Sequence, residues 1–226
     1  MSLKIKPRAF WYRVLAASAW IGFSVGLLLT LIDYQPSWDA HPDLTLFNYH
    51  PGFMGIFART LDFMSYFTLW SNLAVAIIFT KLARTPEKIS KRMLTLIPTS
   101  LLMITVTGIL YNALIAPSYP PHGFFIFTSF FEHILTPLLA LYVWFTCGPH
   151  LMSFQKIGHY FIVPIAYLIY TLARGAVIHQ YPYGFLNAAK WGYRDFTIAS
   201  LEIMVFSLLT VSILVTIDRR RARQKR

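Results

Sequence analysis

The sequence predicts an all-α integral membrane protein, a bundle of six transmembrane helices in a single domain over residues 1–226. Of its 226 residues, 56% are hydrophobic and 13% are charged, whereas a soluble domain carries about 25% charged residues. The hydrophobic residues gather into six runs close to the roughly 20 residues that span a bilayer. Lipid offers the backbone no hydrogen-bond partner, so each run is expected to be helical. This composition excludes a disordered chain, a disulfide scaffold and an ordinary soluble enzyme.

The six predicted spans are each long enough to cross a bilayer without a charged residue at their centre. They are residues 14–32, 63–82, 93–116, 124–147, 160–180 and 196–217. We interpret the first as a helix rather than a cleaved signal, because its apolar run continues past the small residues 16–19 to Ile32. Residues 33–62 then form a long outer loop, and residues 218–226 form a basic tail.

The basic residues predict the direction of the bundle. Sixteen of the 20 lysine and arginine residues fall on one side of a six-span topology. The positive-inside rule makes this side cytoplasmic, which places both termini in the cytoplasm and the protein in the cell (inner) membrane. The basic tail then faces anionic lipid rather than nucleic acid. The expected partner is therefore the bilayer itself, and the oligomeric state stays open.

Polar side chains within the membrane concentrate in the outer halves of five spans. With a rise of ~1.5 Å per residue, Thr68 lies ~8 Å and His133 ~13 Å below the outer ends of their spans. Polar and charged groups inside a bilayer are costly and need a function or a partner. We therefore expect a polar cavity that opens outward. Its candidate residues are Thr68, Asn72, Tyr111, Asn112, Glu132, His133, Arg174, His179 and Glu202.

Helical geometry limits how the acidic candidates can act. Glu132 and His133 are adjacent, so their side chains point about 100° apart and Glu132 does not orient His133 on its own helix. A carboxylate that orients His133 would come from another span, and Glu202 is the candidate. Glu202 or Glu132 could equally neutralise Arg174.

Thr68 and His133 are the pair with the clearest chemistry. A threonine hydroxyl is a weak nucleophile and needs a base within hydrogen-bond reach, and imidazole titrates near working pH. Asn72, Asn112 or Arg174 could donate to a developing oxyanion. The same residues also have structural interpretations: a hydroxyl that bonds its own helix for Thr68, and an amide that joins two helices for Asn72.

Three segments carry a resemblance to a known family. They are Tyr66-Phe67-Thr68-Leu69-Trp70-Ser71-Asn72-Leu73, then Glu132-His133 with Pro137, and finally Pro164, Tyr167, Tyr170, Arg174-Gly175 and Tyr181-Pro182-Tyr183-Gly184-Phe185-Leu186-Asn187. Through them, residues 63–218 resemble the bacterial six-helix branch of the androgen-induced and androgen-dependent TFPI-regulating membrane protein family. The resemblance implies an intramembrane threonine hydrolase that cleaves fatty acid esters of hydroxy fatty acids, with Thr68 and His133 as its catalytic pair. Gly184 and Asn187 depart from the pattern of the branch, which has proline and aspartate there.

The leading hypothesis is therefore a hydrolase of membrane lipid esters that needs no cofactor and no metal. A non-catalytic lipid-binding protein and a proton-coupled transporter would use the same cavity, although the inner half lacks a matching polar path. A haem protein with His133 and His179 as axial ligands is a further alternative. The single cysteine, Cys147, excludes an internal disulfide and a cysteine-rich metal site.

Overall fold

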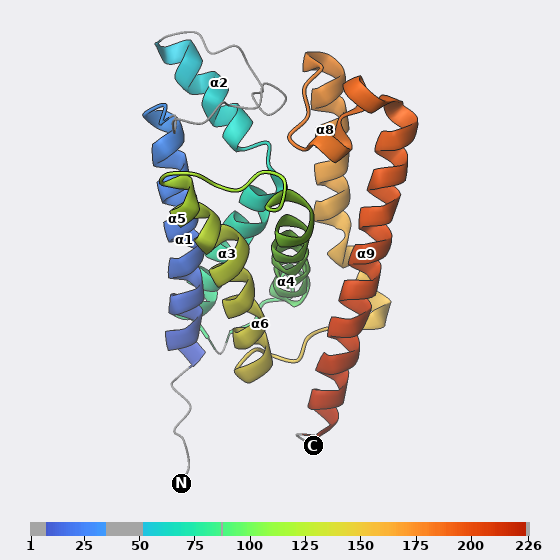
Figure 1. Cartoon of the computed structure of the whole chain (residues 1–226). Coiled ribbons are helices and arrows are strands. Elements are labelled where there is room, and N and C mark those ends of the chain that lie inside the picture. Colours follow the sequence, from blue (N-terminus) through green and yellow to red (C-terminus); the bar gives the residue numbers. More distant parts are fainter. Residues whose placement is uncertain (1–7, 35–51, 87, 225–226) are drawn as a thin grey trace.

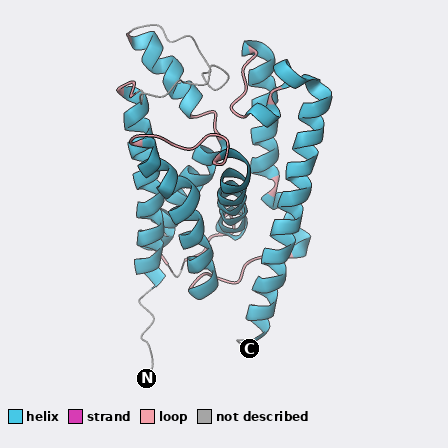
Figure 2. Cartoon of the chain, viewed as in Figure 1, coloured by secondary structure: helices cyan, strands magenta, loops and turns pink. Residues whose placement is uncertain are grey.

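A computed structural model describes residues 8–34, 52–86 and 88–224, and all regular structure in these ranges is helical (Figure 2). Most of the helices run lengthwise through one bundle, in which α1 begins and α9 ends at the same end (Figure 1). The helices are α1 (Arg8–Leu31), α2 (Phe53–Phe63), α3 (Phe67–Arg84), α4 (Met93–Leu110), α5 (Phe125–Phe130), α6 (Thr136–Thr146), α7 (Ile157–Tyr160), α8 (Ile162–Ile178) and α9 (Ala188–Gln224). Two π-helical turns, Tyr111–Ile115 and Phe131–Leu135, extend α4 and join α5 to α6, and short 3-10 turns cover Phe154–Lys156 and Gly184–Leu186.

The helical, multi-pass character predicted from the sequence is confirmed for the described residues. Five helical segments are long and apolar enough to cross a membrane, and the bent pair α2–α3 makes a sixth candidate. The five are Arg8–Leu31, Met93–Ile115, Phe125–Thr146, Phe154–Ile178 and Ala188–Gln224. The largest difference from the predicted bounds is at the last segment, where one helix continues through the predicted tail as far as Gln224.

The second predicted span, residues 63–82, is not one straight helix. α2 and α3 meet at an angle of 80° across a short break. α2 lies within the predicted outer loop 33–62, so the prediction of a loop is wrong for its last part. Residues 35–51 of that loop lie outside the described residues. Hydrophobic periodicity could not reveal this bend, because the chain on both sides of it is apolar.

Side chains next to the bend satisfy its exposed carbonyl groups. The indole N–H of Trp70 donates to the carbonyl oxygen of Met64 at 2.9 Å, and the Ser65 hydroxyl donates to the carbonyl oxygen of Asp62 at 2.6 Å. Tyr167 of α8 donates to the carbonyl oxygen of Ser65 at 3.0 Å. These contacts take the place of water, so the helix can break here without leaving these carbonyl groups unsatisfied.

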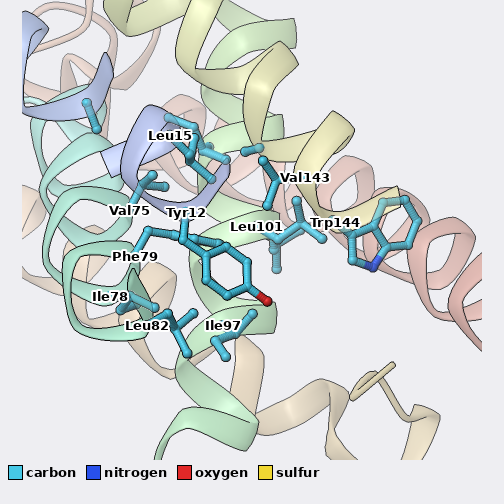
Figure 3. Packing of buried hydrophobic residues seen from close by; sticks show 14 of the residues in the cluster. Tyr12, Leu15, Val75, Ile78, Phe79, Leu82, Ile97, Leu101, Val143 and Trp144 are labelled. Carbon is cyan, nitrogen blue, oxygen red and sulfur yellow. The ribbon is translucent and has the colours of Figure 1, made fainter. Parts of the chain in front are cut away.

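The main hydrophobic core lies where α1, α3, α4 and α6 meet (Figure 3). Its labelled members are Tyr12, Leu15, Val75, Ile78, Phe79, Leu82, Ile97, Leu101, Val143 and Trp144. Small buried residues, Ala16 and Ala19 on α1 and Ala76 on α3, let the backbones of these two helices approach closely, as is common where helices pack inside membranes. This core holds α3 and α6 in place, and both elements lead into the candidate site.

α8 and α9 form a hairpin that packs on the other side of α4 (Figure 1). A second hydrophobic cluster lies within the hairpin and contains Tyr181, Leu186, Ala188 and Phe196. Gly175 lies against the ring of Tyr181, where an added Cβ would come within 2.1 Å of the ring carbons. The absence of a side chain at Gly175 therefore lets the connection between the two helices fold back onto α8.

Asp218 attaches the far end of α9 to the bundle. Its carboxylate accepts hydrogen bonds from the indole of Trp144 at 3.1 Å and from the backbone N–H of Met152 at 3.0 Å, and it contacts His150 at 3.0 Å. Arg221 donates to the carbonyl oxygens of Trp144 and Phe145, at the end of α6. An arginine in this position satisfies terminal carbonyl groups and complements the helix dipole.

Candidate active site

Thr68 lies in the first turn of α3, directly after the bend. Tyr66, the residue before the helix, has an extended backbone, and Phe67 and Thr68 are the first two helical residues. Backbone N–H groups in a first turn have no partner within the helix, and the dipole makes this end electropositive. The bend therefore places a hydroxyl group, and the positive end of a helix, inside the bundle.

His133 lies in the π-helical turn Phe131–Leu135, and Pro137 accounts for that turn. The N–H of Thr136 bonds to the carbonyl oxygen of Phe131, in the π pattern. Pro137 has no N–H, so the carbonyl groups of Glu132 and His133 both lose the backbone donor that a helix would supply. Such turns are frequent at functional sites, because they displace side chains from the regular helical positions.

Two asparagine side chains supply the missing donors. Asn72 Nδ2 donates to the carbonyl oxygen of Glu132 at 3.2 Å, and Asn112 Nδ2 donates to that of His133 at 2.9 Å. Each amide also bonds a carbonyl of its own helix, that of Thr68 for Asn72 and that of Gly108 for Asn112. Their N–H groups are thus committed to the backbone. The prediction that these amides donate to an oxyanion is not supported by this geometry, and they support the His133 turn instead.

The structure brings Thr68 and His133 together. Thr68 Oγ1 lies 3.2 Å from Nε2 of His133, and both side chains are buried, with exposed fractions of 7% and 8%. The two residues are 65 positions apart in the chain and come from different helices. Their separation is a hydrogen-bond distance between a hydroxyl and an imidazole nitrogen.

The other ring nitrogen of His133 contacts Ser129. Nδ1 lies 3.2 Å from the Ser129 hydroxyl and 3.2 Å from its carbonyl oxygen. The Ser129 hydroxyl itself donates to the phenol oxygen of Tyr111 at 2.8 Å. Since both Ser129 atoms can accept, this arrangement assigns the proton to Nδ1 and leaves Nε2 as the acceptor for the Thr68 hydroxyl.

Tyr111 holds the imidazole from one face. The two rings are stacked, with centroids 3.4 Å apart and planes 11° from parallel. Tyr111 belongs to the other π-helical turn, Tyr111–Ile115, so both π-helical turns contribute to the site. Stacking and hydrogen bonding together define the orientation of His133, and no carboxylate contributes to it among the described residues.

A narrow cavity extends from Thr68 between α3, α4 and the α8–α9 hairpin. It contains about 740 Å³ of empty space, part of which opens to the outside. Its polar lining groups are the hydroxyls of Thr68, Thr107, Tyr111, Tyr167, Tyr183 and Ser207. All its other lining residues are apolar, among them Met103, Val106, Leu110, Phe161, Ile165 and Met204. The cavity is thus suited to a hydrocarbon chain with one polar group near Thr68.

Tyr183, in the connection between α8 and α9, lies directly over the first turn of α3. The backbone N–H of Thr68 donates to its phenol oxygen at 3.4 Å. Burial raises the pKa of Tyr183 above its ordinary value, so the phenol keeps its proton at neutral pH. Its O–H is therefore a donor next to Thr68.

The remaining predicted residues lie elsewhere. Arg174 Nη2 donates to Asp62 Oδ1 at 2.5 Å, so its acidic partner is neither Glu202 nor Glu132. Asp62 is the last but one residue of α2, and the bend turns it inward toward α8. Glu202 and His179 are exposed on the surface of the hairpin and do not reach His133, so the prediction that Glu202 orients His133 is wrong.

Glu132 points away from His133, as the helical geometry predicts. Its side chain lies against α1, where added Cβ atoms at Gly22 and Gly26 would come within 2.9 Å of its Cγ and 3.4 Å of its Oε1. Oε1 is buried without a hydrogen-bond partner among the described residues. Glu132 therefore packs in a groove of glycines and takes no part in the Thr68–His133 contact.

Three residues that make contacts at the site are not predicted from the sequence. Asp62 falls within the predicted outer loop, Ser129 belongs to no predicted site, and Tyr183 is part of a motif with no role assigned to it. The i, i+4 spacing of Ser129 and His133 was the available signal for the second contact. Within the described ranges, no group of three or more histidine, cysteine or acidic side chains is arranged to hold a metal ion.

No family model, curated protein or solved structure matches this chain. The fold and the site themselves define the class: a multi-pass helical membrane protein with a buried threonine–histidine pair, of which the threonine lines a mostly apolar cavity.

Proposed function

We propose that this protein is an intramembrane hydrolase of lipid esters, with Thr68 as the nucleophile and His133 as the base. The observation that carries the proposal is the 3.2 Å contact between Thr68 Oγ1 and His133 Nε2, with Thr68 lining the mostly apolar cavity. A hydroxyl nucleophile next to a base that a third group orients is the recurring arrangement for acyl transfer. Here the orienting group is Ser129 instead of a carboxylate.

The reaction proceeds in two halves. Thr68 Oγ1 attacks the ester carbonyl carbon while its proton passes to His133 Nε2. The tetrahedral intermediate collapses, the C–O bond to the alcohol breaks, and His133 returns the proton to the departing alcohol oxygen. Water then attacks the acyl-Thr68 ester with His133 again as the base, which releases the fatty acid and restores the hydroxyl. Atoms and protons balance without a cofactor.

The start of α3 supports the proposed oxyanion. The O–H of Tyr183 lies beside Thr68 as a donor, whereas the backbone N–H of Thr68 bonds to the Tyr183 oxygen and that of Leu69 to the carbonyl oxygen of Tyr66. Donors held in place by the fold stabilise a developing negative charge more than mobile water does, because they need no reorganisation. The positive end of the α3 dipole acts in the same direction.

The cavity lining supports a lipid as the substrate. Fourteen of its 20 lining residues are apolar and none is charged, so it fits an acyl chain and disfavours an ionic solute. The resemblance to the intramembrane threonine hydrolases favours fatty acid esters of hydroxy fatty acids, or similar esters, as the class. A relay of protons across the membrane has no support in this lining.

We further propose the topology that this function needs. Counting the bent pair α2–α3 as one span gives six candidate spans, with the start of α1 and the end of α9 on the same side. The positive-inside rule makes that side cytoplasmic and the membrane the cell membrane. Thr68 and His133 then lie in the outer half of the bilayer, where water reaches the acyl intermediate from outside.

The test is hydrolysis of a panel of lipid esters by the purified protein in lipid nanodiscs, together with labelling by a fluorophosphonate and mass spectrometry of the adduct. We expect Thr68→Ala and His133→Ala each to abolish hydrolysis, and the adduct to form on Thr68 only when His133 is present. Thr216→Ala is the matched control, since its hydroxyl bonds only to its own helix among the described residues. Full activity in either site variant would overturn the assignment.

The same cavity also favours a second candidate, a lipid-binding protein without catalysis. Its distinguishing result is a bound lipid that co-purifies with the protein and is recovered intact, with no adduct on any hydroxyl of folded protein. The labelling experiment therefore decides between the two functions.

A further inference from the structure

We propose that a second lipid site lies on the exposed surface of the α1–α3 pair, where an anionic phospholipid places its phosphate between Arg13 and Arg84. The groove is separate from the cavity at Thr68. It is lined by Arg13, Ala16, Ala17, Trp20, Thr80, Ala83 and Arg84. The proposal is independent of hydrolysis, since none of these residues contacts Thr68 or His133 among the described residues.

The packing of α1 on α3 brings the two arginines to one end of this groove. The indole N–H of Trp20 donates to the Thr80 hydroxyl at 3.0 Å, which sets the register of the antiparallel pair. Moving along both helices from that contact, Ala17 comes level with Ala83 and Ala16 with Arg84, and Arg13 lies about one turn further along α1, at the same end of the groove. Seven residues separate Trp20 from Arg13 and four separate Thr80 from Arg84, so the two arginines start about 10 Å and about 6 Å nearer the end where α1 begins.

The floor of the groove fits the remainder of a glycerophospholipid. The groove contains about 700 Å³ of empty space, counting the part that is open to the surroundings. Alanines leave room beside the backbones, and Trp20, with 37% of its surface exposed, forms a side wall. A lipid whose phosphate contacts the arginines would extend one acyl chain along the alanines and past Trp20, toward the middle of the bilayer. This is the orientation of a lipid in the leaflet at that end of the bundle.

The charge of the groove favours an anionic occupant. It contains two guanidinium groups and no acidic side chain. Guanidinium forms paired hydrogen bonds to phosphate oxygens, and anionic lipids of the cytoplasmic leaflet attract basic residues at the membrane surface. In the topology proposed above, Arg13 and Arg84 face that leaflet. A zwitterionic lipid would bring an extra positive charge to the same place, so phosphatidylglycerol is preferred over phosphatidylcholine.

A second copy of the chain is the competing occupant, because small residues also line helix interfaces in membranes. A two-fold symmetric contact would, however, place the same patch on both partners. It would thus bring four guanidinium groups together without an acidic side chain from this groove to neutralise them. Charge therefore favours a lipid over a second copy.

The experiment measures the apparent affinity of the purified full-length protein for phosphatidylglycerol, by native mass spectrometry and by thermal unfolding with added lipid. We expect phosphatidylglycerol to raise the unfolding temperature more than phosphatidylcholine does. Arg13→Gln and Arg84→Gln should each weaken binding about tenfold, because each removes about one charge-assisted hydrogen bond. The double variant should remove the preference for phosphatidylglycerol. Unfolding in phosphatidylcholine verifies that the variants are folded.

Three controls make the result specific. The double variant Arg220→Gln/Arg223→Gln removes two charges from the exposed end of α9 and should keep the preference, whereas an equal loss there would overturn the site. Ala17→Phe, which fills the groove and leaves both arginines, should weaken binding. Glycerol 3-phosphate should not replace the lipid, and stabilisation by it would indicate a site for free phosphate. A dimer in detergent that resists added lipid would assign the groove to a second copy.

Discussion

The side-chain amide of Asn112 donates a hydrogen bond of 2.9 Å to the carbonyl oxygen of His133. That oxygen needs a donor from outside its own helix because Pro137, four residues on, has no N–H. The proline thus creates the displaced turn that carries the histidine, and the asparagine makes that turn tolerable in a lipid environment, where an unsatisfied carbonyl group is costly.

Restoring the N–H at position 137 should undo this arrangement. In Pro137→Ala the new N–H can bond the carbonyl oxygen of His133 and convert the π turn to α-helix, which rotates the two halves of the span by about 100°. We expect hydrolysis to fall by at least about 100-fold, because small displacements of catalytic groups have effects of this size, while the unfolding temperature stays the same or rises. Pro98→Ala, in α4 away from His133, is the control and should retain activity.

Ser129 should act as a positioning residue for His133. Ser129→Ala removes the hydroxyl from Nδ1 but leaves the carbonyl contact, so we expect kcat to fall about tenfold, equivalent to one hydrogen bond, with KM unchanged. Ser129→Thr should retain most of the rate. A purely structural role for Ser129 would not lower kcat while leaving KM unchanged. Thr128→Ala is matched by position, since the Thr128 hydroxyl bonds the carbonyl of Phe125. A rate in Ser129→Ala equal to that of the native protein would contradict the orienting role.

The Asp62–Arg174 pair should be a structural clamp between α2 and α8. Both side chains are largely buried, with exposed fractions of 6% and 11%. Asp62→Asn would leave a buried guanidinium without its charge partner, and we expect a loss of about 3–5 kcal/mol of stability. Asp33→Asn is the comparison, because Asp33 pairs with Arg59 at 3.3 Å but is 45% exposed, and exposed pairs contribute about 1 kcal/mol or less. Unfolding temperatures in detergent measure both, and equal effects would contradict the clamp.

The cavity should set the length of the acyl chain that is cleaved. Ser207 lines its end remote from Tyr183, on α9, and is 6% exposed. We expect Ser207→Trp to shift the preferred substrate to shorter chains without loss of the Thr68 adduct. Leu208→Trp, one residue on and 47% exposed, should leave the chain-length profile unchanged. Competition between esters of different chain length measures the profile, and an unchanged preference in Ser207→Trp would place the chain elsewhere.

Much of the fold could be predicted because apolar runs of membrane length are a strong and local signal. The break between α2 and α3 could not, since residues 64–66 contain neither proline nor glycine and the bend depends on contacts from Trp70 and Tyr167. The same bend explains why Asp62 was missed as the partner of Arg174. Glu202 shows the converse limit: depth in the membrane follows from position in a span, but the direction in which a side chain faces depends on how α9 packs.

The pairing of Thr68 with His133 followed from the resemblance, and the expected position of both residues in the outer halves of their spans was consistent with it. The roles of Asn72 and Asn112 required the structure. Asparagine in a span is equally suited to bond a ligand or a backbone, and the choice here depends on Pro137 in a different helix. The sequence of one helix does not reveal that a neighbouring helix has a carbonyl group in need of a hydrogen-bond donor.

After its bend at Gly192, α9 continues without interruption to Gln224, and its length exceeds the ~30 Å thickness of a hydrocarbon core. Its final turns therefore continue as a stiff helix, and hydrogen bonds of Asp218 and Arg221 attach this end of α9 to α6. Any tilt of the α8–α9 hairpin that widens the cavity must therefore also move the final turns of α9. A pair of spin labels, one on the last turn of α9 and one at the start of α1, would report the opening of the lipid cavity from the opposite end of the molecule.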